Sequence, residues 1–284
     1  MKIHSFSKLL SIPFILAASV IFITFFGDRS EHLVWMGVPV FFLIMIYIGH
    51  GDIDYWWLKK NPIPLDQKIV DWLHKFHDFF KSLSPSDKKE FEDRLSNYLF
   101  ARESLSVGAK EMVEVPHDLK AFIFSQCIML TFGQDDFLLG DFDRIYFYRH
   151  PFPTRRYPQL HTFECEKEDK MIILSLDEAI YGVVNPKKSY NIALHAYAEA
   201  YIHLYPAKIY PIVHDHGWQG LEKIFRQSKT DIINKSGVAE IDILAAHIVA
   251  YFTDSILYEE LFKTEHKQLQ LILNTGYASK PTFH

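Results

Sequence analysis

Two long apolar runs, Leu9–Gly27 and Leu33–Gly51, lie within the first 60 residues, and neither contains Asp, Glu, Lys or Arg. Each is close to the roughly 20 residues that a helix needs to cross the hydrocarbon core of a bilayer. Only residues 28–32 separate them, which favours a tight helical hairpin. A signal peptide is the alternative for the first run, but Phe25-Phe26-Gly27-Asp28 offers no small-residue cleavage site. We therefore predict that residues 1–60 form a two-helix transmembrane hairpin, with spans at about 9–27 and 33–51.

Basic residues flank the hairpin on one side of the predicted membrane. Lys2 and Lys8 precede the first run, Lys59 and Lys60 follow the second, and the connecting loop holds only Arg29. Because Lys and Arg are concentrated in cytoplasmic loops, both ends of the hairpin are predicted to lie in the cytoplasm. The expected location is a bacterial-type inner (cytoplasmic) membrane, with the lipid bilayer as one partner.

The pattern changes after the second run. Tyr55, Trp56 and Trp57 indicate an aromatic belt at the membrane interface. Residues 61–64, Asn-Pro-Ile-Pro, predict a short stiff linker. From residue 65 onward charged residues return and the apolar positions become periodic, which predicts one cytoplasmic domain over 65–284.

Helical spacing dominates the first part of this domain. Residues 65–83 carry apolar side chains three and four positions apart, which predicts one helix. Ser84-Pro85-Ser86-Asp87 is expected to end that helix and to cap the next, which should run to about residue 104. Residues 116–132 form a third predicted helix, with Gly133 as a cap just beyond its end.

Alternating patterns appear in the middle of the chain. Residues 144–149 predict a strand, and residues 162–166 and 171–175 predict a β-hairpin around a charged turn. Three further helical stretches are predicted, from Leu176 onward, at 189–204 and at 237–274, the last broken near Thr264. The predicted fold class is therefore α+β, mostly helical with a small sheet.

Composition narrows the range of functions. The chain has 30 Lys and Arg against 35 Asp and Glu, a formal net charge of −5. An acidic chain without a basic block has no electrostatic basis for binding nucleic acid. Cys127 and Cys165 stand outside any CxxC or Cys/His zinc spacing, so they are expected to be buried, reduced thiols.

The clearest candidate chemistry lies in residues 189–204. His195, Glu199 and His203 follow one another at i, i+4 and i+8, so they share one face of an otherwise apolar helix. A buried ionisable group is unfavourable unless it is paired or metal-bound. The spacing is therefore compatible with a His–Glu pair inside the core or with metal ligands. His214 and His216 form a second candidate cluster, which we expect to be a solvated turn.

The stretch from Met171 to Ala200 resembles the core of the Mlc titration factor A family of zinc peptidases. Its strand motif is Leu174-Ser-Leu-Asp177. Its helix motif, Asn191-Ile-Ala-Leu-His195-Ala-Tyr-Ala-Glu199, stands where the family has Asn-x-x-x-His-Glu-Phe-Ala-His. A later helix of the family is matched by His247-Ile-Val-Ala250, Asp254 and His266-Lys267. The resemblance covers roughly residues 65–276 and implies a zincin-like metallopeptidase fold.

The departures from the family motif concern its chemistry. In a zincin helix, two histidines one turn apart hold zinc and the Glu after the first is the general base. His195 matches the first ligand, Ala196 stands at the general-base position, and Glu199 replaces the second histidine. His247 stands where the family supplies a glutamate ligand. The resemblance thus implies a candidate zinc set of His195, Glu199 and His247, and a one-turn shift would substitute Asp254 for the last.

The sequence is compatible with three functions. The favoured hypothesis is a membrane-anchored, non-catalytic relative of these peptidases that binds a regulatory protein partner, such as the sugar-responsive transcription repressor that the resemblance implies. The second is an active zinc metallopeptidase with an altered ligand set, in which Glu199 or Asp254 acts as base. The third is a structural membrane protein, whose hairpin assembles with others.

Overall fold

The computed structural model describes residues 5–25, 34–101, 103–107 and 115–274. The chain divides into two compact units, Met1–Ile63 and Pro64–His284. Lys2, the end of the first predicted span and the connecting loop lie outside the described residues, as does Leu33 at the start of the second span.

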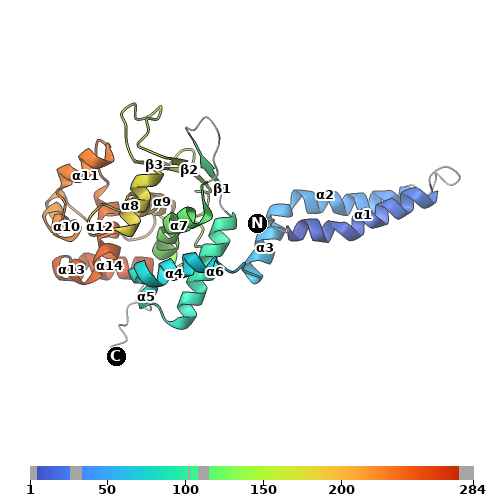
Figure 1. Cartoon of the computed structure of the whole chain (residues 1–284), viewed down its shortest axis with the longest axis horizontal. Coiled ribbons are helices and arrows are strands. Elements are labelled where there is room, and N and C mark those ends of the chain that lie inside the picture. Colours follow the sequence, from blue (N-terminus) through green and yellow to red (C-terminus); the bar gives the residue numbers. More distant parts are fainter. Residues whose placement is uncertain (1–4, 26–33, 102, 108–114, 275–284) are drawn as a thin grey trace. The chain divides into compact units, whose positions relative to one another are not determined.

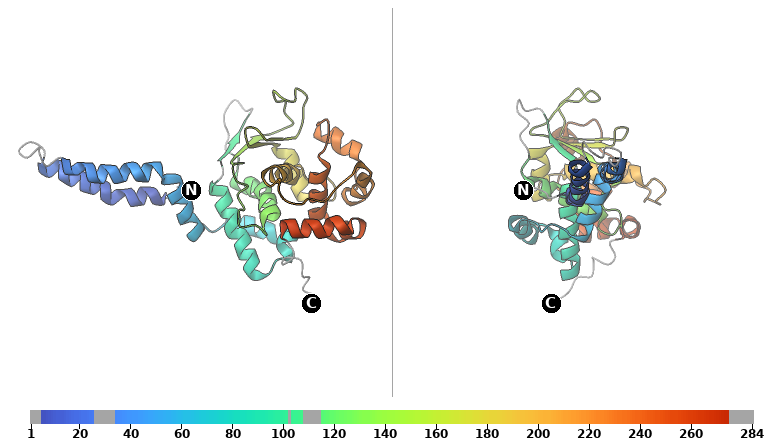
Figure 2. Two further views of the ribbon diagram at one scale, coloured as in Figure 1. Left: turned by 180° about the vertical axis from the view of Figure 1, so that it is seen from behind. Right: turned by 90° about the vertical axis from the view of Figure 1, so that its right-hand side faces the viewer.

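The first unit contains two apolar helices that lie side by side, α1 (Phe6–Phe25) and α2 (Gly37–Ile48) (Figures 1 and 2). Phe14 of α1 stacks on Phe42 of α2 with ring centroids 5.0 Å apart. Most other apolar side chains of α1 point outward, and Ile23 is 76% exposed. By length and composition, Phe6–Thr24 can cross a membrane, whereas Val34–Ile48 qualifies only together with α3 (His50–Lys60), from which it is bent by 69°.

The second unit begins with three helices, α4 (Gln67–Phe76), α5 (Asp78–Ser82) and α6 (Pro85–Ala101). The prediction of one helix over 65–83 is wrong, because the chain becomes extended at His77. The ring Nδ1 of His77 accepts a hydrogen bond from the Phe80 amide at 3.2 Å and so starts α5 anew. The cap at Ser84 is confirmed, since its hydroxyl accepts from the Asp87 amide at 3.2 Å. Helix α6 ends at Ala101, short of the expected residue 104.

A four-stranded mixed sheet forms one layer of this unit, in the order β1-β2-β4-β3. Its strands are β1 (Glu103–Ser106), β2 (Arg144–Tyr148), β3 (Phe163–Glu166) and β4 (Met171–Ser175). Strands β1, β2 and β4 are parallel, whereas β3 pairs with β4 in antiparallel fashion, as the predicted hairpin requires. Strand β1 was not predicted. The rings of Phe124 on α7 (His117–Thr131) and Phe147 on β2 pack together, with centroids 6.2 Å apart, so α7 lies against this sheet.

Gly133 follows α7 as predicted, but for a different reason. Among the described glycines, left-handed backbone occurs at Gly140 and Gly237, so Gly133 is not a left-handed cap. A Cβ atom at Gly133 would lie 2.2 Å from the carbonyl oxygen of Leu273. The glycine therefore permits the end of α14 to approach the end of α7.

The remaining chain is helical. Its elements are α8 (Leu176–Val184), α9 (Ile192–Leu204), the 3₁₀ turn η2 (Asp215–Gly217), α10 (Trp218–Phe225), α11 (Lys229–Ser236), α12 (Ile243–Thr253), α13 (Ser255–Leu261) and α14 (Lys263–Leu273). The predicted stretch over 237–274 contains three helices, beginning at Ile243, with breaks at Asp254 and Phe262. The break at Phe262 agrees with the one predicted near Thr264, and the break at Asp254 was not predicted. Buried alanines on both α9 and α12, such as Ala200 and Ala246, allow these two helices to pack closely in the core. Mostly helical structure with a small sheet confirms the predicted α+β composition.

Candidate functional site

The start of α9 is held in place by Asn191. Its side-chain oxygen accepts from the Leu194 amide at 3.0 Å, which caps the helix, and its amide nitrogen donates to the Gln126 side chain of α7 at 2.8 Å. Asn191 itself is buried. These two bonds fix the first turn of α9 against α7, and with it the position of His195.

His195 and Glu199 form the polar pair that their spacing predicts. The ring Nε2 of His195 lies 3.0 Å from a carboxylate oxygen of Glu199, and the ring Nδ1 lies 2.7 Å from the hydroxyl of Tyr190. The His195 side chain has no exposed surface, whereas that of Glu199 is 17% exposed. A Tyr190 hydroxyl that donates to Nδ1 leaves Nε2 protonated and donating to Glu199. Both ring nitrogens are thus engaged by protein groups.

The charge of Glu199 shapes the surrounding acidities. Burial raises the pKa of Glu199, but the hydrogen bond and electrostatic interaction with His195, together with the charges of Lys167 and Arg156, bring that pKa below its usual value. Burial, reinforced by the Glu199 charge, raises the pKa of the Cys165 thiol on β3. Burial, together with the charges of Glu199 and Asp242, raises the pKa of Tyr190. Glu199 is therefore the ionised member of this group.

His247 makes its contacts with a different set of residues. Its ring Nδ1 lies 2.9 Å from the Tyr258 hydroxyl, and its ring packs edge-on against Phe262 with centroids 4.7 Å apart. Its Nε2 is buried without a hydrogen-bond partner among the described residues, and a Cβ on Gly217 would lie 3.3 Å from it. Burial lowers the pKa of His247 to about 4. His247 is therefore a neutral core side chain.

Asp254, the alternative ligand, caps a helix. One carboxylate oxygen accepts from the Leu257 amide at 3.2 Å, and the other lies 3.2 Å from the Lys187 ammonium. His203 is exposed and packs edge-on against Phe142. His214 and His216 are exposed, as predicted for a solvated turn, and their rings stack 5.4 Å apart.

The predicted zinc ligands are His195, Glu199 and His247, and one zinc ion would need their donor atoms to lie around a common centre. In the part of the chain that the structure describes, no three His, Cys, Asp or Glu side chains are grouped so that they could hold one metal ion. The His195 and Glu199 atoms, however, are 3.0 Å apart, near the separation of about 3.4 Å that two ligands of one tetrahedral zinc have. The structure brings together two of the predicted ligands, and the third stays a prediction.

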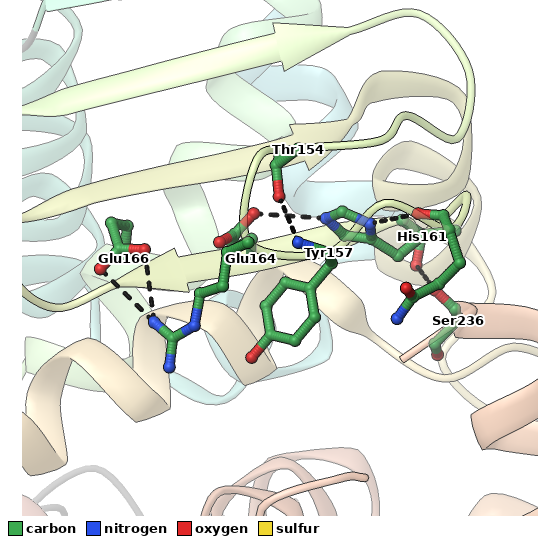
Figure 3. Close-up of polar contacts among 9 residues, drawn as sticks. Thr154, Tyr157, His161, Glu164, Glu166 and Ser236 are labelled. Atoms are coloured by element: carbon green, nitrogen blue, oxygen red, sulfur yellow. Dashed lines mark hydrogen bonds and ion pairs between the residues drawn. The ribbon is translucent and has the colours of Figure 1, made fainter. Parts of the chain in front are cut away.

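A second buried polar cluster, which the sequence did not reveal, lies beside β3 (Figure 3). His161 and Glu164 point toward each other, with Nε2 3.4 Å from a carboxylate oxygen, and both side chains are almost fully buried. The other ring nitrogen of His161 lies 3.0 Å from the Gln159 carbonyl. Both nitrogens of the His161 ring therefore face acceptor oxygens. Thr154 and Tyr157 close the loop above it with a hydrogen bond of 3.1 Å.

Tyr190 and Cys165 are the site neighbours that the sequence did not single out. Tyr190 stands five residues before His195, outside the helix, and Cys165 comes from the edge strand of the sheet. In the structure the cap at Asn191 shows that the residues just before α9 fold back onto its first turn. No protein-family model, curated protein or solved structure matches the chain.

Proposed function

We propose that this protein is a membrane-anchored, non-catalytic relative of the Mlc titration factor A peptidases, which acts by binding a regulatory protein partner in the cytoplasm. The observation that carries the proposal is the closed state of the His195 ring, with Tyr190 on one nitrogen and Glu199 on the other. A ligand of a catalytic zinc must face a cleft that admits substrate and water, and this ring has no exposed surface.

The missing base supports the same conclusion. Ala196, at the general-base position of the family motif, is fully buried in the hydrophobic core. A methyl group cannot accept a proton from a metal-bound water. The nearby carboxylate, Glu199, is already hydrogen-bonded to His195. The scaffold therefore keeps the helix of the family motif without its proton acceptor.

Membrane anchoring is supported by the surface of the first unit. Helix α1 exposes apolar side chains around most of its circumference, which is typical of a helix in lipid. Lys8 stands near the start of α1, and Lys59 and Lys60 end α3, which favours a cytoplasmic location for these ends. We place both spans, at about 9–27 and 33–51, in an inner membrane. Activity of a periplasm-only reporter fused after residue 284 would overturn that orientation.

An altered zinc hydrolase is the second candidate, and the distance between His195 and Glu199 is compatible with it. The His195 and Glu199 atoms are close enough to share a metal, and Tyr190 would then orient the ring from its other nitrogen. In that case His195 and Glu199 would hold zinc, which would supply a Lewis acid. The two candidates differ in whether removal of His195 changes metal content.

The deciding experiment measures bound metal and peptide hydrolysis on the full chain in detergent. Wild type is compared with His195→Ala and Glu199→Gln, and His203→Ala is the matched control, because it removes an exposed histidine from the same helix. We expect sub-stoichiometric metal and no turnover in any of the four proteins. Stoichiometric zinc that is lost in His195→Ala but kept in His203→Ala would establish a metal site. Turnover with the same dependence would refute the proposal.

The binding role needs a separate measurement in the native membrane. Photo-crosslinking of the full chain should capture a partner that residues 1–63 alone do not capture, and His195→Ala should capture it equally well. If capture requires only the first unit, the chain is a structural membrane protein, which is the third hypothesis.

A further inference from the structure

Helix α3 departs sharply from the direction of the predicted second span. The axes of Val34–Ile48 and His50–Lys60 differ by 69° across a break at Gly49. The Gly49 amide donates to the Met45 carbonyl at 3.0 Å and completes the last turn of α2. Where Val34–Ile48 stands along the membrane normal, a helix bent by 69° from it lies closer to the membrane plane than to the normal.

The composition of α3 does not suit the hydrocarbon core. It carries Asp52 and Asp54 near its start and Lys59 and Lys60 at its end, and charged groups at the centre of a bilayer are strongly unfavourable. Between them, Trp56 is 51% exposed and Trp57 is 39% exposed. Tryptophan accumulates where lipid headgroups meet the hydrocarbon, because its ring is apolar and its N–H is polar.

Contacts between α3 and the first residues of α1 fix where α3 lies along the length of α1. The Asp54 carboxylate accepts hydrogen bonds from the Ser5 hydroxyl at 2.5 Å, the Ser7 amide at 2.7 Å and the Ser7 hydroxyl at 2.9 Å. The first amides of a helix have no partner within the helix, and a carboxylate there also faces the positive end of the helix dipole. Phe6 stacks flat on Trp57, with ring centroids 4.1 Å apart. Helix α3 is thus held where α1 begins, at the end of its apolar length.

Lys60 adds a basic group beside the exposed indole. Its ammonium lies 4.4 Å from the centre of the Trp56 ring. A tryptophan with a lysine over its face can place the ring among the upper acyl chains while the ammonium reaches the phosphates. We infer that α3, held by Asp54 and Phe6/Trp57 to the start of α1, is an in-plane helix that binds the headgroup layer of the bilayer. This inference rests on the proposed membrane anchoring and adds to it an interaction surface with lipid phosphates as the partner.

Depth measurements on α3 test the inference directly. Asp52 and Lys59 are both exposed and are seven residues apart, so they share one face of the helix. At 1.5 Å per residue, a helix at 69° to the span changes depth by about 4 Å between these positions, whereas a helix that continues the span changes depth by about 10 Å. Spin labels at Asp52→Cys and Lys59→Cys report depth through their accessibility to oxygen and to a water-soluble nickel chelate.

The measurement uses the full chain in vesicles of phosphatidylcholine and phosphatidylglycerol. The unsubstituted protein controls for background labelling, because both native cysteines are buried. A label at Val20→Cys, a position on α1 that is 62% exposed, reports whether the hairpin itself is in lipid. We expect Val20→Cys to lie deep in the hydrocarbon and the two α3 labels to lie at headgroup level, about 4 Å apart in depth.

The other outcomes distinguish failure of the in-plane helix from failure of the proposed membrane anchoring. A difference of about 10 Å between the α3 labels, with Val20→Cys deep, would show that α3 continues the span and would refute the in-plane helix. Two fully aqueous α3 labels with a deep Val20→Cys label would refute binding to the headgroups. An aqueous label at Val20→Cys would refute the membrane anchoring as well.

Discussion

Two buried histidines should make the second unit sensitive to mild acid. His77 and His247 are both almost fully buried, and burial lowers the pKa of each to about 4. Asp78 opposes this effect at His77 but does not outweigh it. In each ring one nitrogen is hydrogen-bonded, to the Phe80 amide and the Tyr258 hydroxyl respectively, and the other has no hydrogen-bond partner among the described residues. Both side chains are therefore neutral when the protein is folded.

The sign and size of the effect follow from proton linkage. An unfolded histidine has a pKa of about 6.5, so the unfolded chain binds a proton between pH 6.5 and pH 4 that the folded chain refuses. The part of the unfolding free energy that depends on each histidine being neutral is fully present above pH 6.5. It falls as the pH falls through this window and is lost below about pH 4. At pH 5 the difference for each histidine is about 2 kcal/mol, or about 4 kcal/mol for the pair. That is a large part of the stability of a typical domain.

Urea unfolding of the full chain in a mild detergent, at pH 7.5 and at pH 5, measures this loss. His77→Asn keeps an acceptor for the Phe80 amide, and His247→Gln keeps a partner for Tyr258. Each substitution should reduce the loss between the two pH values by about 2 kcal/mol, whatever its effect at pH 7.5. The exposed His203→Gln is the control and should leave the loss unchanged. If the double variant loses as much stability as wild type, neutral burial of these histidines is not the cause.

Three further substitutions have outcomes that the structure specifies. Gly220→Ala places a Cβ atom 2.4 Å from Cζ of Phe262, and this overpacking should lower the unfolding free energy by about 1–3 kcal/mol, which a urea titration would detect. Ala196→Glu puts a carboxylate into the core; we expect it to lower the thermal midpoint and to produce no peptidase activity, so measurable turnover would contradict the closed site. Glu199→Gln removes the charge beside the buried ring of His195 and should lower the unfolding free energy by about 1–3 kcal/mol, and an unchanged value would show that the pair is not stabilising.

The features that the sequence predicts well are local ones. Ser84 caps α6 through a residue three positions away, and the hairpin of β3 and β4 closes across four charged residues. Both depend on neighbours within a few positions. Strand β1 was missed because the partner that makes it a strand, β2, lies about 40 residues further along the chain. The break at His77 was missed because the apolar spacing continues through it, and only the ring nitrogen reveals that a new helix begins.

The candidate site divides in the same way. The spacing of His195 and Glu199 brings them together on any helix, so this pair was predictable. The sequence also shows directly that an alanine, Ala196, follows His195. The surroundings of His247, the third predicted ligand, could not be read from its position in a motif, because they depend on how α12 packs on its neighbours. In the structure that packing directs His247 to Tyr258 and Phe262, while the charge at this end of α12 that acts on Tyr190 is that of Asp242, the residue that caps the helix.

Whether the pair on α9 is a metal site or a closed ion-dipole pair depends on side chains outside α9. Tyr190 occupies the inner nitrogen of His195, and it suits both cases. The exposed side of the pair is different, because only the Glu199 carboxylate reaches solvent there, with Lys167 and Arg156 close enough to lower its pKa. Arg156 also pairs with Glu166, at 3.3 Å, so it is part of a wider charged group beside the sheet. The hydrogen bond from His195 and the neighbouring positive groups all stabilise the ionised Glu199 carboxylate, which favours the pair as a self-contained part of the core.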